Sequence, residues 1–308
     1  MITIHSQNPS KISSPAAGLI ELIPNAILNI APERLAELEE THPDLSIIVE
    51  DSTTWIFGVD APGKVVRLSV FCLEVLWTTA YSHCLLYQKM IGGRQPDNEF
   101  ARSALMTPEC QEACRLLNWI TQRRLGAAVP HEWPAGFPTP SEPNDAADQR
   151  KLATEIALGA LGFIIHHELA HIRLLHSGKS EISSEKDADH AAVDWILRDG
   201  SISAIDTADK KRLLCIAHAL SVTVVRDIYT GDFDGITHPR SFERLNYALS
   251  RHLTDNNHLS RSFIAFVLKL HMDNSSIAYW DQSKEFFSFD EILQSFFDAF
   301  ADFAERKT

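Results

Sequence analysis

The chain has 308 residues, of which 45% are hydrophobic and 22% are charged, the composition of a globular protein with a large core. Its formal net charge of −13 argues against a nucleic-acid partner, because binding to phosphates requires clustered lysine and arginine. The amino terminus has no basic region followed by an apolar core, so no secretory signal is predicted and the cytoplasm is the expected location.

Cysteine usage and hydropathy argue against three further classes of protein. The five cysteines are an odd number without a Cys-x-x-Cys pair, so neither a disulfide framework nor a thiolate zinc site is expected. The longest apolar stretch, residues 152–165, is shorter than the roughly 20 residues that a membrane span needs. The sequence therefore predicts a soluble protein without a membrane partner.

The first third of the chain contains the strongest strand signals. Residues 1–31 are punctuated by prolines and predict irregular structure, and residues 32–39 predict a short helix. Residues 46–50 and 55–59 are rich in β-branched and aromatic side chains around a polar turn, so they predict a β-hairpin. Residues 64–70 are a candidate third strand.

Two long helices and a proline-rich loop come next. Apolar residues recur at helical spacing over residues 69–91 and 107–125, and the polar end of the second segment, residues 122–124, is expected to be solvated. Residues 129–144 carry five prolines and a glycine. We interpret this loop as a connection between two parts of the chain, with a flap over a site as the alternative.

The second half of the chain is predicted to be helical throughout. Residues 148–176 form one long helix whose apolar first half should be buried, and Ser183 or Ser184 caps the next helix. Further helical patterns cover residues 206–229, 241–252, 260–272 and 289–305. The expected fold class is mainly α, an α+β fold with only a small hairpin or sheet.

A His-Glu-x-x-His motif ends the apolar part of the long helix. His167 and His171 are four residues apart, which places both imidazoles on one helix face, as two ligands of one zinc ion require. Glu168 lies about 100° further round the helix, where it suits a general base better than a third ligand. His166 has no partner four residues on and is expected to be a packing or hydrogen-bonding residue.

A third ligand is needed on an element that packs against this helix. Fourteen residues after His171, Glu185 and Asp189 lie one turn apart on a common face of the next predicted helix. Glu185 can ligate the metal while Asp189 orients a ligand histidine. An acidic helix start that complements the helix dipole is the simpler alternative, and the motif itself occurs by chance in roughly a few per cent of such chains. The two features in this order favour the metal site.

These motifs resemble the gluzincin metallopeptidases, in which two histidines and a later glutamate hold zinc. Thr237-His238-Pro239 with Glu243 and Arg244 is similar to the His-Pro-x-x-x-Glu-Arg element of the CAAX-prenyl-protease-type gluzincins. That resemblance implies that His238 stabilises the transition state and that Arg244 pairs with Asp189. It also implies a zincin-like helical core around the motif helix.

In length and arrangement the chain resembles the family of the phage exclusion protein Lit, over residues 152–249. This resemblance implies a zinc endopeptidase that acts in phage defence on a protein of the translation machinery. The expected organisation is an amino-terminal subdomain, residues 1–140, with the hairpin and two long helices, and a helical zinc metallopeptidase core, residues 146–308, packed as one compact unit.

Two alternatives to a peptidase remain open at the level of sequence. A zinc-containing regulatory or binding protein would keep the ligands but recognise a partner without cutting it, and a chance motif would bind no metal. The peptidase interpretation implies a protein or peptide substrate and leaves open an activating partner. Zinc content and chelator-sensitive proteolysis distinguish the three.

Overall fold

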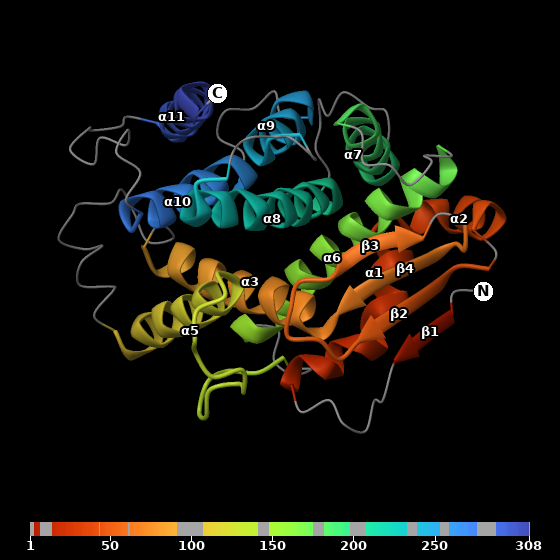
Figure 1. The fold of residues 1–308 in the computed structure, drawn as a ribbon, viewed down its shortest axis with the longest axis horizontal. Helices are drawn as coiled ribbons and strands as arrows, with labels where there is room; N and C mark the ends of the chain where they lie inside the picture. Colours follow the sequence, from red (N-terminus) through yellow and green to blue (C-terminus); the bar gives the residue numbers. More distant parts are fainter. Residues whose placement is uncertain are drawn as a thin grey trace. The chain divides into compact units, whose positions relative to one another are not determined.

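The structure, a computed structural model, is mainly α with one small sheet, which confirms the predicted fold class (Figure 1). It describes residues 3–6, 14–42, 44–60, 62–90, 107–140, 148–174, 182–197, 207–232, 239–252, 259–275 and 288–307. The chain forms two compact units, residues 1–162 and 163–308, so that the boundary falls within helix α6 (Gln149–Arg173).

The sheet of the first unit has four strands in the order β1-β2-β4-β3. The strands are β1 (Thr3–Ser6), β2 (Ser46–Glu50), β3 (Phe57–Asp60) and β4 (Val65–Ser69). Strand β2 pairs in parallel with both β1 and β4, whereas β3 and β4 are antiparallel. The third strand is confirmed, but the predicted hairpin of β2 with β3 is wrong because β4 lies between them.

Burial explains which strand takes the central position. Val66 and Leu68 of β4 are fully buried, as are Ile47 and Val49 of β2, whereas every residue of β3 is partly or fully exposed. Pairing β4 with β2 joins the two apolar strands. It leaves β3 at the edge of the sheet, where the partly exposed side chains of that strand are tolerated. Strand propensity alone does not predict that β4, and not β3, pairs with β2.

The predicted irregular structure of residues 1–31 is wrong for the described residues. Besides β1, they form a 3-10 helix, η2 (Pro15–Leu22), and helix α1 (Ile23–Asn29). The Ser14 side chain accepts a hydrogen bond from the Ala16 amide, and Pro15 and Pro24 lie at the start of the two helices. The prolines thus begin helices here rather than break them. The predicted short helix follows as η3 (Pro32–Arg34) and α2 (Leu35–Thr41).

Helices α3 (Val70–Met90) and α5 (Pro108–Arg124) pack against each other and confirm the two long helices predicted. Thr107 caps α5 by accepting a hydrogen bond from the Cys110 amide. Arg123, expected to be solvated, is instead buried: its Nη1 lies 2.6 Å from Glu74 Oε2. The pair forms because a buried guanidinium needs an opposite charge.

The described part of the proline-rich loop packs on these two helices. The ring of Trp133 contacts Trp77 of α3 and Trp119 of α5 at centroid distances of 5.8 and 5.5 Å. Trp119 Nε1 donates a hydrogen bond to the Pro130 carbonyl. As far as Pro140, therefore, the loop is held against the first unit.

Gly162 of α6 lies against α1 so closely that a methyl group does not fit. A Cβ atom at this position would lie 2.9 Å from the Ala26 carbonyl oxygen and 3.1 Å from Ile30 Cδ1. We expect Gly162→Ala to lower the free energy of unfolding, because an overlap cost of about 1–3 kcal/mol exceeds the helix-propensity gain of up to about 1 kcal/mol. Urea unfolding measures the difference. Gly18→Ala is the control, since nothing lies within 4 Å of that position; equal stability of the two variants would contradict the prediction.

The described residues of the second unit form the carboxyl-terminal part of α6 and five further helices. These are α7 (Ile182–Leu197), α8 (Thr207–Thr230), α9 (Ser241–His252), α10 (Leu259–Asp273) and α11 (Phe289–Lys307). Helix α8 packs against α7, α9 and α10, and α11 packs against α10 and α9. All five were predicted: the bounds of α9 match, and the ends of α8, α10 and α11 lie within two residues of the predicted ones. Ser183 and Ser184 lie within the first turn of α7 and not at its cap.

Helices α6 and α8 are long and apolar enough to cross a membrane by length and composition. However, 61% and 72% of their apolar windows are buried within the structure. Such burial is typical of the core helices of a soluble protein.

Candidate metal site

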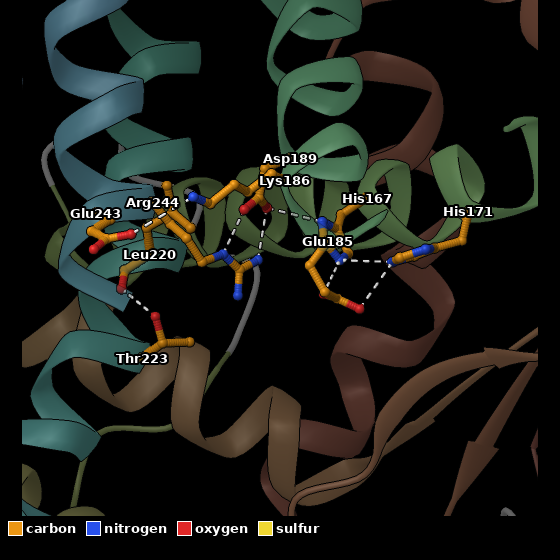
Figure 2. Close-up of polar contacts among 9 residues, drawn as sticks. All are labelled: His167, His171, Glu185, Lys186, Asp189, Leu220, Thr223, Glu243 and Arg244. Atoms are coloured by element: carbon orange, nitrogen blue, oxygen red, sulfur yellow. Dashed lines mark hydrogen bonds and ion pairs between the residues drawn. The ribbon is translucent and has the colours of Figure 1, made fainter. Parts of the chain in front are cut away.

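Two histidines of α6 face each other across one helical turn. His167 Nε2 and His171 Nε2 lie 3.2 Å apart, and the two rings are nearly perpendicular (Figure 2). The four-residue spacing on a regular helix produces this approach, as the sequence predicted. His167 is buried, and the side chain of His171 is 12% exposed.

The first turn of α7 brings Glu185 to both histidines. Glu185 Oε2 lies 3.3 Å from His167 Nε2, and Glu185 Oε1 lies 3.5 Å from His171 Nε2. The carboxylate is buried, so it faces the two rings instead of solvent (Figure 2). One ligand atom from each of the three residues lies within 4.8 Å of the other two. The structure thus brings together the three residues that the sequence named as metal ligands.

The spacing of these atoms fits a zinc ion. Two ligand atoms about 2.0–2.1 Å from zinc at the tetrahedral angle lie about 3.3 Å from each other. The measured separations within the triad are 3.2, 3.3 and 3.5 Å. Two neutral histidines and one carboxylate also leave a fourth tetrahedral position for water or substrate, the donor set of catalytic zinc sites.

Asp189, one turn after Glu185 on α7, joins the histidine to the partly buried Arg244. Its Oδ1 lies 2.9 Å from His167 Nδ1, on the side of the ring opposite to the triad. Arg244 of α9 donates two hydrogen bonds to the same carboxylate, from Nε at 2.6 Å and from Nη2 at 2.7 Å (Figure 2). The fork of the guanidinium matches both carboxylate oxygens. This arrangement orients the His167 ring so that Nε2 points at Glu185 and His171.

The charges of the cluster favour a cation. Glu168, Glu185 and Asp189 contribute three carboxylates, whereas Arg244 contributes one positive charge, so two negative charges remain when both histidines are neutral. Burial alone would lower the pKa of His167, but the charge of Asp189 and contacts with Asp189 and Glu185 outweigh it and raise the pKa to about 9. A divalent cation would compensate the same negative charges and would take the place of the proton on His167.

Glu168 is partly buried beside the triad without belonging to it. Burial raises the pKa of its carboxyl, and the neighbouring Glu185 charge acts in the same direction, whereas the charge of His167 opposes it. A carboxylate whose pKa is raised accepts a proton more readily than one in water. Its position one residue after a candidate ligand keeps it within reach of the same site.

Helices α7 and α9 are also joined by contacts that the sequence did not reveal. The rings of His190 and Tyr247 stack with centroids 3.8 Å apart. Lys186 Nζ lies 4.0 Å from Glu243 Oε2 at the exposed side of the same helix pair (Figure 2). The glutamate of the His-Pro-x-x-x-Glu-Arg element therefore contacts α7 from the surface, and its arginine contacts α7 from within. His238 lies outside the described residues, and its role stays a prediction.

Together, a helical unit with two histidines on one helix and a glutamate on the next resembles the site of the gluzincin peptidases. The chain belongs to the peptidase U49 family, whose family model matches residues 66–264. The matched range includes the triad, Asp189 and Arg244. The protein is therefore a member of a peptidase family.

A curated relative supports this assignment along most of the chain. The protein is 26% identical over 275 residues to a cell death peptidase of Escherichia coli (strain K12), which covers 83% of this chain and 88% of the relative. The resemblance to Lit-type peptidases is thereby confirmed. No solved structure matches.

Proposed function

We propose that the protein is a zinc-dependent endopeptidase whose metal is held by His167, His171 and Glu185. The observation that carries the proposal is the buried triad itself, whose ligand atoms are 3.2–3.5 Å apart, as tetrahedral zinc ligands are. Membership of a peptidase family supports hydrolysis of peptide bonds over a binding role.

In this proposal each residue of the cluster has a separate task. When bound, zinc lowers the pKa of water and polarises the carbonyl of the scissile bond. Glu168 accepts a proton from the attacking water and delivers it to the leaving amine. Asp189 and Arg244 hold His167 in the orientation for binding. The resemblance adds His238 as a donor to the oxyanion.

We also propose the substrate class and the setting of the reaction. A protein or peptide substrate follows from the peptidase family. The likeness to Lit-type peptidases favours a protein of the translation machinery as the target, phage defence as the setting and the cytoplasm as the location. The name of the Escherichia coli relative, a cell death peptidase, is in keeping with such a toxic activity.

Zinc content and chelator sensitivity test the proposal together. We expect about one zinc per chain in the purified protein, and fragments of lysate proteins that disappear when a chelator is added and return with zinc. His171→Ala should lose the zinc because it removes one of three ligands. Elemental analysis and mass spectrometry of new protein termini provide the measurements. Zinc without fragments would favour a binding or regulatory protein, and a zinc-free chain would exclude both.

A further inference from the structure

Outside the triad, helices α6 and α7 meet at the buried Trp195 of α7. The ring of His166 stacks on Trp195 with centroids 5.6 Å apart and an interplanar angle of 26°. The guanidinium of Arg173 lies over the same side chain, 5.2 Å from the ring centroid. Trp195 is 3% exposed and His166 is 4% exposed, so the stack belongs to the interior of the second unit.

The two α6 residues that contact Trp195 flank the histidine ligands in the sequence. His166 immediately precedes His167, and Arg173 follows His171 by two residues. They are seven residues apart, about two turns, and therefore share one face of α6, turned by about 100° or more from the face that carries the ligands. Trp195 thus supports the same two turns of α6 from a second direction.

On α7, Trp195 and Glu185 are far enough apart to define the direction of the helix. They are separated by ten residues, about 15 Å along the axis, so a pivot of only about 10° around Trp195 would move Glu185 by about 2.6 Å. Ligand distances in metal sites vary by only about 0.2 Å. The crossing angle of α6 and α7 therefore decides whether Glu185 reaches the two histidines.

Polar contacts tie α7 to three helices. Asp189 contacts His167 of α6 and is paired with Arg244 of α9, and Arg212 of α8 donates a hydrogen bond to the Ile196 carbonyl at the end of α7. The contact between Asp189 and His167 lies within the cluster itself. The stack on Trp195 adds a contact with α6 about 9 Å further along α7, so that two separated points together set the direction of α7 relative to α6.

We propose that Trp195 is a positioning residue of the metal site, which sets the crossing of α6 and α7 and so holds Glu185 at the distance that zinc requires. This inference rests on the proposed zinc function and extends it to a residue outside the triad. Truncating Trp195 should weaken zinc binding more than its contribution to core packing explains.

Zinc affinity, measured by competition with a chromogenic chelator, tests this role independently of peptidase activity. We expect Trp195→Leu to bind zinc at least about tenfold more weakly than the wild type, the lower end of the loss seen when residues that support metal ligands are replaced. Trp195→Phe keeps a smaller ring over His166 and should lose about threefold. Thermal unfolding of the metal-free proteins gives the loss of stability for comparison.

Phe296→Leu is the matched control. Phe296 is a fully buried aromatic residue of the same unit that stacks on Phe300, but its helix, α11, carries no residue of the site. It should lose thermal stability and keep wild-type zinc affinity. An unchanged affinity in Trp195→Phe, or an equal loss of affinity in Phe296→Leu, would overturn the positioning role. A wild-type protein that binds no zinc would overturn the proposed function itself.

Discussion

Glu168→Gln is expected to abolish proteolysis while leaving the zinc in place. The amide has the size of the carboxylate but cannot accept a proton, and loss of a general base costs about 10²–10⁴-fold in rate. Burial raises the pKa of Glu168, which adapts it to proton transfer, yet Glu168 is not one of the three residues that face the metal position. The zinc content of the variant should therefore equal that of the wild type, whereas the chelator-sensitive fragments should be lost.

Glu155→Gln provides the control for this prediction. Glu155 lies on the same helix, α6, thirteen residues earlier and hence about 20 Å from Glu168 along the axis. The substitution is chemically identical, so any effect of charge or expression on the assay appears in both variants. We expect fragments at the wild-type level from Glu155→Gln. Proteolysis that survives in Glu168→Gln would assign the general base to another residue.

The helices of the second unit could be predicted because each one carries its own signal. The apolar periodicity of residues 259–273 and 289–307 continues over four or more turns, and packing on neighbouring helices does not alter it. The sheet differs because strand pairing is a long-range property. Strands β2, β3 and β4 have similar local sequences, and only the burial of Val66 and Leu68 decides that β4 pairs with both others.

The triad could be predicted for a related reason. His167 and His171 lie on one helix, and Glu185 follows within fourteen residues, so a local geometric rule brings them close together. Arg244 is 55 residues from Asp189, and no rule of spacing joins them, so only the resemblance to known gluzincins suggested the pair. Trp195 had neither signal, because its stack on His166 depends on how two helices cross.

The bidentate pair of Arg244 with Asp189 leads to the largest expected change in stability. Arg244→Met removes both hydrogen bonds and leaves the buried Asp189 carboxylate beside Glu185 and Glu168. Breaking one side of a buried ion pair costs about 3–5 kcal/mol. We expect a loss of this size in the free energy of unfolding of the metal-free protein. The loss should be smaller with zinc, whose charge compensates the same carboxylates.

The dependence on pH follows from the same pair. In the wild type, burial opposes ionisation of Asp189, but Arg244 and His167 outweigh it and hold the pKa of the carboxyl well below its usual range. The stability that this provides is present above the ordinary carboxyl pKa and is lost in acid. Without Arg244 the folded-state pKa rises, so the variant can neutralise Asp189 by protonation. The difference in stability between wild type and Arg244→Met should therefore narrow as the pH falls.

A second substitution separates the unpaired charge from the lost contact. Asp189→Asn combined with Arg244→Met removes the buried charge, so much of the unfolding free energy should return, whereas zinc affinity should stay low because the amide orients His167 less firmly than a carboxylate. Glu243→Gln, one residue before Arg244, removes the charge from the exposed contacts with Lys186 and Arg240 and should change stability by less than about 1 kcal/mol. Urea titrations give the free energy of unfolding of the wild type, Arg244→Met, the double variant and Glu243→Gln. If Arg244→Met proved no less stable than Glu243→Gln, the pair of Arg244 with Asp189 would not stabilise the site.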